Sequence, residues 1–325
     1  MKSSLDTSAT GNGHPRRSLG GALDVFPVAL GTNPFGWTSS DDEAAEVLDA
    51  YTAGGGNFID TADSYPHWAE GRSGGESEQA IGRWLAGGRA PDDLIIATKV
   101  AQHPEFLGLS PDNVRAAADA SLRRLGVERI DVYYAHFDDE ATPLTETVRV
   151  FSSLVDEGLV GHVAISNYSP QRLREWMEIT EREGFHRPIA HQPHYSLMER
   201  GIEADLLPLD RELGLSVVPY FSLAKGFLTG KYRPGVQIDS PRAPQASAYL
   251  ETPRGERVLA ALDGISGRLK VEPGAVALAW LLAQPGVVAP IASARNASQV
   301  PMLLDAARIS LDPSEVEELT RAAAA

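Results

Sequence analysis

Short apolar runs alternate with segments of helical periodicity along most of the chain. Runs with the length of buried strands occur at residues 28–31, 58–60, 94–100, 130–135, 160–166, 189–192, 215–220 and 287–291. Helices are expected at residues 41–53, 77–86, 110–125, 144–156, 169–183, 206–213, 255–269, 275–283, 298–306 and 313–323. Strict alternation of strand and helix indicates a parallel sheet. Eight such units in about 300 residues fit an α/β fold, a closed (β/α)8 TIM barrel.

Both the start of the chain and one long segment depart from this alternation. Residues 1–16 are rich in Ser, Thr, Gly and Asn, so we expect a mobile tail before a single barrel domain over residues 17–325. Short apolar runs on either side of Gly20-Gly21 predict an N-terminal hairpin. The irregular segment at 222–253, after the seventh strand, is too long for a plain connector, so we expect it to be functional.

Composition removes several classes of function. The formal net charge of −15 argues against nucleic acid or an anionic membrane as a partner. The chain has no cysteine, which excludes disulfides and thiolate chemistry. It has no apolar run long enough to span a bilayer and no secretory signal at its start, so we expect a cytoplasmic protein. The oligomeric state is not specified by these patterns.

Polar residues fall at the carboxyl ends of the expected strands, where barrel enzymes build their sites. Asp60 ends the second strand, Lys99 lies near the end of the third, and His136 follows the fourth. A buried carboxylate needs a cation, so Asp60 is expected to pair with Lys99, and Tyr65 could share that ammonium. Further polar residues at later strand ends are Ser166, Asn167, Gln192, Tyr220 and Arg295.

A metal-dependent barrel hydrolase is a competing interpretation. His191 and His194 are three residues apart, and two aspartates closely follow His136. A metal site needs several such ligands converging on one ion, whereas Lys99 and Asn167 stand where ligands would be needed. We therefore expect no metal. The chain also lacks the glycine-rich phosphate loops that follow a strand in dinucleotide-binding and nucleotide-hydrolysing proteins.

Five motifs make the chain resemble the aldo-keto reductase family over about residues 19–319. They lie at residues 57–62 with Tyr65, 96–99, 131–136, 165–168 and 226–232. The resemblance implies a reductase that converts an aldehyde or ketone to an alcohol with NADPH, using Asp60, Tyr65, Lys99 and His136. Lys99 would lower the pKa of Tyr65 from about 10 and Asp60 would hold Lys99. His136 would orient the substrate carbonyl, and Tyr65 would donate the proton.

The resemblance also assigns a cofactor site and a loop over it. The implied cofactor residues are Gly31, Thr32, Ser166, Asn167, Gln192, Tyr220, Ser222, Leu223, Lys231, Arg242, Ser293, Arg295 and Gln299. Arg295 matches a 2′-phosphate and so favours NADPH, with NADH left open. Phe221-Ser222 replaces the family's Ser-Pro, and Met302-Leu303 replaces its Glu-Asn near the adenine. Loop residues expected to form an apolar or aromatic substrate pocket are Phe35, Trp37, Trp68 and Phe137.

A second functional class stays open beside the enzyme. Potassium-channel β subunits share this fold, and a nucleotide-binding regulatory subunit would act mainly through a partner. The four residues Asp60, Tyr65, Lys99 and His136 are all present, which favours the enzyme. The sequence does not identify the carbonyl substrate or the direction of the reaction in the cell.

Overall fold

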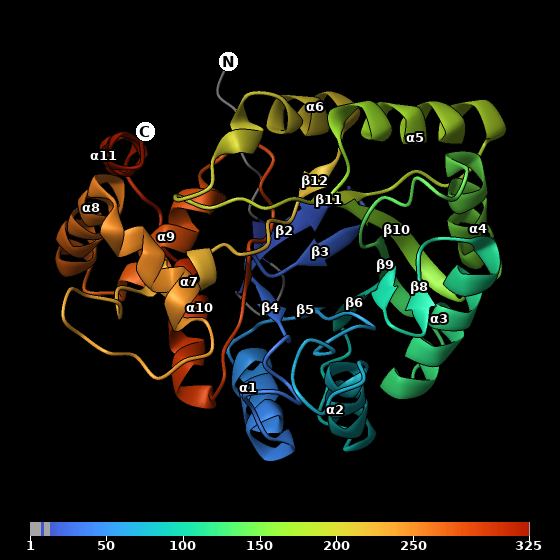
Figure 1. Ribbon diagram of the computed structural model, residues 1–325, viewed down its shortest axis with the longest axis horizontal. Coiled ribbons are helices and arrows are strands. Elements are labelled where there is room, and N and C mark those ends of the chain that lie inside the picture. Colours follow the sequence, from blue (N-terminus) through green and yellow to red (C-terminus); the bar gives the residue numbers. More distant parts are fainter. Residues whose placement is uncertain (1–7, 10–13, 325) are drawn as a thin grey trace.

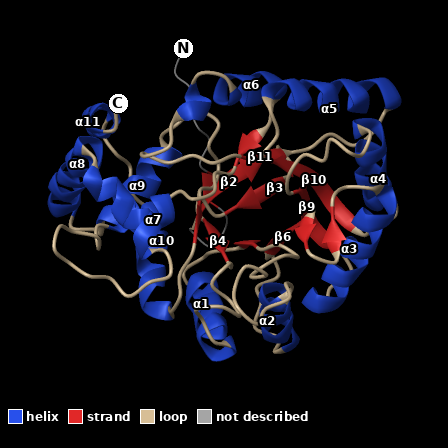
Figure 2. Cartoon of the chain, in the orientation of Figure 1, coloured by secondary structure: helices blue, strands red, loops and turns tan. Residues whose placement is uncertain are grey.

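The computed structural model describes residues 8–9 and 14–324, and its centre is an eight-stranded parallel sheet (Figures 1 and 2). The strands are, in spatial order, β12 (Ser216–Val217), β11 (Ala190–Gln192), β10 (Val160–Ser166), β9 (Ile130–Ala135), β6 (Ile95–Val100), β5 (Phe58–Asp60), β4 (Ala29–Gly31) and β13 (Ile291–Ala292). From β4 to β12, strands of this sheet that follow one another in the chain are neighbours in the sheet, and the last strand, β13, lies beside the first, β4. This order produces the alternating α/β architecture that the sequence indicates.

Helices surround the sheet on its outer side (Figure 2). The α-helices are α1 (Asp41–Ala53), α2 (Glu76–Ala86), α3 (Pro111–Leu125), α4 (Leu144–Asp156), α5 (Pro170–Glu183), α6 (Leu206–Leu213), α7 (Ala243–Ser247), α8 (Pro253–Leu269), α9 (Pro273–Leu282), α10 (Val300–Ala306) and α11 (Pro313–Ala322). Each long helix turns an apolar stripe inward; Trp84 of α2 and Trp176 of α5 are buried in this way.

Local residues fix where helices begin and end. Ser169 accepts a hydrogen bond from the backbone N–H of Arg172 at the start of α5. Gly184 adopts a left-handed conformation with φ of 72° at its end. Gly126 and Gly214 end α3 and α6 in the same left-handed conformation, and the expected bounds of α3, α5 and α6 agree with the structure to within one residue.

An antiparallel hairpin of β2 (Pro15–Leu19) and β3 (Leu23–Val25) precedes the sheet. Gly20 and Gly21 both have positive φ, which the tight connection between the strands requires. Leu19 and Val25 pack into the cluster that holds Phe58 at the start of its strand. The hairpin therefore covers the amino-terminal end of the sheet, opposite the strand ends that carry the polar residues.

The expected tail at residues 1–16 lies partly outside the described residues. Within the described part, β1 (Ser8–Ala9) pairs with β2, and β2 already begins at Pro15. Arg16 is buried, and its guanidinium donates to the carbonyl oxygen of Gly55. Ordered structure thus begins before residue 17.

Several elements differ from the expected pattern. A small hairpin of β7 (Gln102–His103) and β8 (Phe106–Leu107) follows β6. The segment 222–253 holds α7 and the 3-10 helices η2 (Ala224–Thr229) and η3 (Ala248–Glu251); η1 (Gly201–Glu203) and η4 (Ala297–Gln299) lie elsewhere. β12 is shorter than expected because Pro219 has no N–H to donate to a ladder.

Backbone hydrogen bonds also connect β12 to the segment that leads into β13. The N–H of Val217 donates to Gly286, and its carbonyl accepts from Val288, each at 2.9 Å. Ile291 and Ala292 pair in turn with Ala29 and Leu30. Among the helices in the described part of the chain, none combines the length and apolar character needed for a membrane span.

Candidate active site

A cavity of about 950 Å³, called here the central cavity, opens at the carboxyl ends of the strands. Its wall includes Gly31 and Asp60, which end β4 and β5, and Ser166 and Gln192, which end β10 and β11. Parallel strands deliver all their carboxyl ends to one side of a sheet, so residues far apart in the chain meet there. The volume is within the range of small-molecule and cofactor sites.

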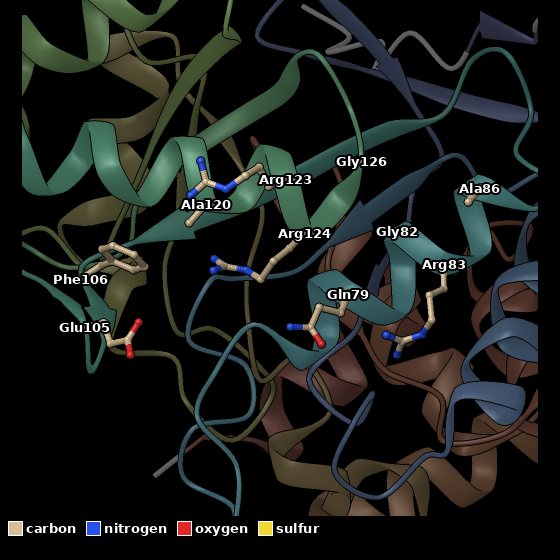
Figure 3. Close-up of a pocket in the computed structure, with 10 residues that line it drawn as sticks. All are labelled: Gln79, Gly82, Arg83, Ala86, Glu105, Phe106, Ala120, Arg123, Arg124 and Gly126. Carbon is tan, nitrogen blue, oxygen red and sulfur yellow. The ribbon is translucent and has the colours of Figure 1, made fainter.

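A second hollow lies on the outer surface between α2 and α3 (Figure 3). Its arginines are largely neutralised: Arg83 pairs with Asp41 and Arg124 with Glu78, each at 2.6 Å. It gathers none of the strand-end residues that the sequence singles out. The candidate active site is therefore the central cavity.

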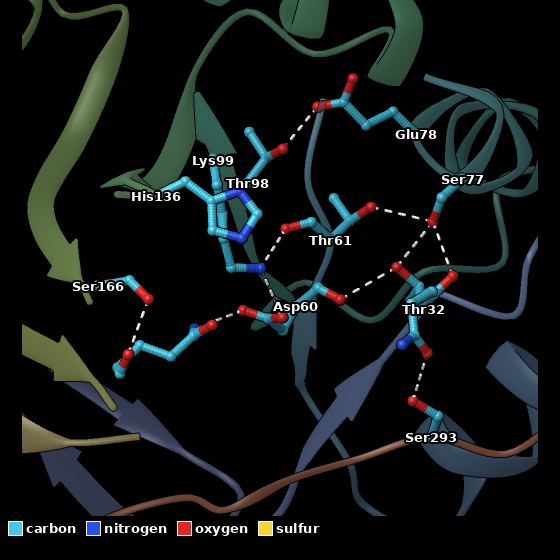
Figure 4. Close-up of polar contacts among 12 residues, drawn as sticks. Thr32, Asp60, Thr61, Ser77, Glu78, Thr98, Lys99, His136, Ser166 and Ser293 are labelled. Atoms are coloured by element: carbon cyan, nitrogen blue, oxygen red, sulfur yellow. Dashed lines mark hydrogen bonds and ion pairs between the residues drawn. The ribbon is translucent and has the colours of Figure 1, made fainter. Parts of the chain in front are cut away.

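Lys99 and Asp60 form a buried ion pair beneath the central cavity (Figure 4). Lys99 Nζ lies 2.7 Å from Asp60 Oδ1, with side-chain exposures of 0% and 3%. The ammonium also donates to the carbonyl oxygen of Thr61, and Gln192 Nε2 donates to Asp60 Oδ2 at 2.9 Å. Burial opposes the charge on Lys99, but Asp60 and Tyr65 raise its pKa above the ordinary value. The lysine is therefore a fixed positive charge at neutral pH.

Tyr65 lies beside this ammonium and lines the central cavity. Lys99 Nζ is 5.1 Å from the centroid of the Tyr65 ring. Burial raises the pKa of the phenol, and Lys99 only partly opposes the rise. Lys99 thus acts on the Tyr65 pKa in the expected direction, but burial outweighs the ammonium and the pKa stays above its ordinary value. The consequence is a protonated phenol at neutral pH, in contact with the cavity.

His136 faces the same end of the cavity. Its ring centroid is 6.1 Å from that of Tyr65. Burial lowers the pKa of His136 well below its usual range, and Lys99 and His67 lower it further. Its Nδ1 is buried with no hydrogen-bond partner in the described residues. The imidazole is therefore neutral and able to donate one hydrogen bond.

A run of hydrogen bonds links the polar residues on the next wall. Tyr220 donates its phenolic O–H to Asn167 Oδ1 at 2.8 Å, and Asn167 Nδ2 donates to Ser166 Oγ at 2.9 Å. Ser166 Oγ then donates to the backbone carbonyl of Gln192 at 2.7 Å. Asn167 has a φ of 58°, a left-handed conformation that asparagine tolerates better than most residues. This run fixes the side chains that present amide and hydroxyl groups to the cavity.

Three cations lie close together in the wall of the cavity. They are Lys231, Arg242 and Arg295, and the described residues provide no ion-pair partner for any of them. Burial lowers the pKa of Lys231, and the two arginines lower it further. Unpaired like charges held close together are costly unless an anion occupies the space between them. This part of the cavity wall thus suits a phosphate-bearing ligand.

Aromatic side chains form the rim beside Arg242, whose guanidinium carbon lies 5.9 Å from the centroid of the Trp37 ring. The ring of Trp68 lies edge-on to Trp37 at 5.8 Å and to Tyr65 at 5.4 Å. Phe137 also lines the cavity and remains 37% exposed. Phe35, expected in this pocket, is instead fully buried in the hydrophobic core and does not line the cavity. Its backbone N–H donates to Thr32 in a turn that directs the ring inward.

All thirteen residues expected to hold the cofactor line the central cavity. They are Gly31, Thr32, Ser166, Asn167, Gln192, Tyr220, Ser222, Leu223, Lys231, Arg242, Ser293, Arg295 and Gln299. Asp60, Tyr65 and His136 line it too, whereas Lys99 lies beneath the surface. Cavity residues that sequence reasoning assigned no role include Asn33, Gln102, Lys225 and Glu272.

Comparison with known proteins agrees with this geometry. The model of the Aldo/keto reductase family matches residues 27–324. The chain belongs to the aldo-keto reductase family. It is an oxidoreductase, and enzymes of this family use nicotinamide cofactors.

Relatives of this aldo-keto reductase match most of its length. It is 34% identical to "Aldo-keto reductase str7" of Strobilurus tenacellus, covering 95% of this chain and 92% of that one. It is 32% identical to "Uncharacterized oxidoreductase YrpG" of Bacillus subtilis (strain 168), covering 89% and 90%. It is also 31% identical to "Probable voltage-gated potassium channel subunit beta" of Oryza sativa subsp. japonica, covering 79% and 80%.

The two histidines that suggested a metal have other contacts in this reductase. His191 Nδ1 lies 3.0 Å from both carboxylate oxygens of Asp210, and both side chains are fully buried. His194 stacks on Tyr220 with ring centroids 5.2 Å apart. Within residues 8–9 and 14–324, no group of three or more His, Asp or Glu side chains is arranged to hold a metal ion.

A buried cluster of three hydroxyl groups near the site was not predicted from the sequence. The hydroxyls of Thr32, Thr61 and Ser77 form a hydrogen-bonded cluster next to the Lys99–Asp60 pair (Figure 4). All three residues are buried. A serine in the first turn of a helix carries no distinctive sequence signal, because that position is common for local capping.

Proposed function

We propose that this aldo-keto reductase reduces an aldehyde or ketone to an alcohol with NADPH, and that Tyr65 donates the proton. The observation that carries the proposal is the buried Lys99 ammonium. It lies 2.7 Å from Asp60 Oδ1 and 5.1 Å from the ring of Tyr65, at the floor of a cofactor-sized cavity. A fixed positive charge beside a phenol favours the developing phenolate.

Each residue of the proposed tetrad has a separate role. His136, as a neutral imidazole, would donate a hydrogen bond to the substrate carbonyl oxygen and orient it. Tyr65 would pass its phenolic proton to that oxygen, and Lys99 would stabilise the phenolate left behind. Asp60 would keep Lys99 charged and in place. A bound nicotinamide supplies the hydride, and the protein supplies placement.

Several features of the central cavity fit NADPH. The amide and hydroxyl groups of Ser166, Asn167 and Gln192 stand close to the tetrad and would hold a carboxamide. Tyr220 would lie against the nicotinamide ring. Lys231 and Arg242 would contact the pyrophosphate, and Arg295 a 2′-phosphate, since guanidinium matches phosphate geometry. The absence of ion-pair partners for these cations within the described residues supports an anionic ligand.

The substrate would occupy the aromatic rim. Trp37, Trp68 and Phe137 line the cavity beside Tyr65, and flat apolar walls favour an aromatic or apolar carbonyl compound. Phe35 has no part in this proposal because it is in the core.

A comparison of Tyr65→Phe with wild type tests the proposed reaction. NADPH oxidation is followed with a panel of aromatic aldehydes, and cofactor binding is measured by tryptophan fluorescence. We expect Tyr65→Phe to lose about 100-fold or more in kcat, the usual worth of a general acid, while still binding NADPH. Tyr168→Phe is the matched control, because that buried hydroxyl has no hydrogen-bond partner among the described residues and does not line the cavity.

The alternative role is distinguished by the same assay. A nucleotide-binding regulatory subunit would bind NADPH without turning it over, and one relative is named a probable voltage-gated potassium channel subunit beta. Equal and negligible turnover by wild type and Tyr65→Phe, with tight NADPH binding by both, would refute the proposed reaction and favour that role.

We also propose that the eight strands close into a single (β/α)8 barrel domain over residues 17–325. The support is the bonding of Val217 to Gly286 and Val288, together with the pairing of β13 with β4. The segment 222–253 would cover the cofactor, since Lys231 and Arg242 belong to both that segment and the cavity wall. The expected cytoplasmic location stays a prediction.

A further inference from the structure

Ser77 occupies an unusual place at the start of α2. It is fully buried, and its hydroxyl bonds to residues 16 and 45 positions away rather than to its own helix. The residue that caps α2 is Gly75, which has no side chain. Ser77 therefore serves something other than the local end of its helix.

The hydroxyl cluster has a defined direction. Thr32 Oγ1 donates to the backbone carbonyl of Asp60 at 3.0 Å, and a carbonyl oxygen only accepts. Ser77 Oγ therefore donates to Thr32, with Thr32 Oγ1 at 2.8 Å and the backbone carbonyl of Thr32 at 2.9 Å as its two acceptors. Ser77 Oγ in turn accepts from Thr61 Oγ1 at 3.0 Å. The order Thr61, Ser77, Thr32, Asp60 uses each hydroxyl proton once and leaves none without an acceptor.

This cluster ends on the two groups that hold the ammonium. Asp60 supplies the carboxylate 2.7 Å from Lys99 Nζ, and Thr61 supplies the carbonyl that accepts from the same nitrogen. The backbone N–H of Ser77 also donates to the carbonyl of Tyr65 at 3.3 Å. Ser77 thus contacts both ends of the loop that runs from Asp60 to Tyr65 (Figure 4 shows the side-chain part).

Thr32 extends the connection to another wall. It follows β4 and lines the central cavity, where the proposed cofactor would lie. The Ser77 hydroxyl of α2 therefore fixes the position of Thr32 in the cavity wall relative to the loop from Asp60 to Tyr65. No other side chain in Figure 4 bonds to both Thr32 and Thr61.

We propose that Ser77 is a positioning residue that sets the separation between Lys99 and Tyr65. The inference rests on the proposed carbonyl reduction and adds a residue outside its tetrad. Catalytic groups need placement well within 1 Å, because a misplacement of that size can cost about 100-fold in rate. Loss of the Ser77 hydroxyl leaves Thr61 and Thr32 without their shared partner and lets the loop shift.

Three variants test the role in turnover. We expect Ser77→Ala to lower kcat about tenfold, with a smaller change in the KM for the carbonyl compound. Thr61→Val removes the neighbouring hydroxyl while keeping the side-chain shape, and should give a similar loss. The double variant should lose no more than either single one, because both break the same connection.

Ser152→Ala separates positioning from stability. Ser152 is a buried serine of α4 whose hydroxyl accepts from the N–H of His186, away from the cavity. We expect it to lower the unfolding midpoint like Ser77→Ala while leaving kcat unchanged. An equal fall in kcat for Ser152→Ala, or additive losses for Ser77→Ala and Thr61→Val, would overturn the proposal. If Ser77→Ala does not fold, Thr61→Val is compared with Ser152→Ala instead.

Crystal structures of wild type and Thr61→Val or Ser77→Ala supply a readout that needs no turnover. A widened separation between Lys99 and the Tyr65 ring supports the proposal, and an unchanged loop from Asp60 to Tyr65 refutes it. If wild type shows no carbonyl reduction, the proposed function fails by itself, and these structures still decide whether Ser77 sets the geometry.

Discussion

The buried ion pair gives a sharp prediction about stability. Lys99→Met replaces the ammonium by an apolar group of similar length and leaves Asp60 buried without its cation. At the observed 2.7 Å, two unit charges attract by about 6 kcal/mol at an effective dielectric constant of about 20. Gln192 still donates to Asp60, and a hydrogen bond to a charged group contributes about 1.5–3 kcal/mol.

We therefore expect Lys99→Met to lower the free energy of unfolding by about 3–5 kcal/mol, the usual cost of breaking a buried pair. Equilibrium urea unfolding, followed by circular dichroism, measures the change. Arg115→Met is the matched control: Arg115 pairs with Glu157 at the same 2.7 Å, but both side chains are more than 40% exposed. Water screens that pair, so its loss should cost far less.

The double variant Lys99→Met/Asp60→Asn should regain most of the lost stability, because it removes the unpaired charge as well. Equal losses for Lys99→Met and Arg115→Met, or a double variant less stable than Lys99→Met, would refute the reasoning.

The effect should also depend on pH in a known direction. Burial raises the pKa of Asp60 even beside Lys99, and removing the ammonium raises it further. A carboxyl with a raised pKa in the folded chain loses its stabilising contribution as pH rises through that value. The difference in unfolding free energy between wild type and Lys99→Met should thus become smaller as pH falls toward about 4, the pKa of an aspartate in the unfolded chain. A difference in unfolding free energy that grows on acidification would contradict a raised pKa for Asp60.

Three further outcomes follow from the site. Arg295→Ala should weaken NADPH binding at least about tenfold and NADH binding little, since one charge-assisted hydrogen bond is worth about 1.5–3 kcal/mol; equal losses for the two cofactors, in a binding titration, would argue against a 2′-phosphate contact. Phe35→Ala should cost about 3–5 kcal/mol of stability without changing the substrate KM, whereas Trp68→Ala should raise that KM at little cost in stability; the reverse pattern would return Phe35 to the pocket. Because burial keeps the pKa of Tyr65 above its ordinary value, kcat for reduction should stay level through neutral pH and decline only above about pH 10; a decline near pH 7 would contradict a protonated phenol.

The Asp60–Lys99 contact could be predicted from the sequence, because a buried carboxylate needs a cation beside it. A carboxylate at the end of an apolar strand has few stable options, and a lysine at the end of the next strand is the nearest cation. Helix bounds were accessible for similar reasons: Ser110 and Pro111 begin α3, and Gly126 ends it with a φ of 70°.

Features that depend on competing effects or on loop geometry were not accessible. The net pKa of Tyr65 depends on how far burial outweighs Lys99, and a motif does not carry that degree of burial. Phe35 was misplaced because aromatic residues in a loop have no periodicity to show which way they face. Ser77 was missed because its partners lie 16 and 45 residues away, beyond any local pattern.

The pairing of β13 with β4 has a consequence for how the chain acquires its fold. Ile291 and Ala292 bond beside Ala29 and Leu30, so the first and last strands of the sheet meet across nearly the whole polypeptide. During synthesis the amino-terminal strands must wait, with one edge unprotected, until residues 291 and 292 have left the ribosome. Contacts between such distant segments slow folding, so truncation before residue 291 should leave a chain that chaperones retain rather than a smaller working enzyme.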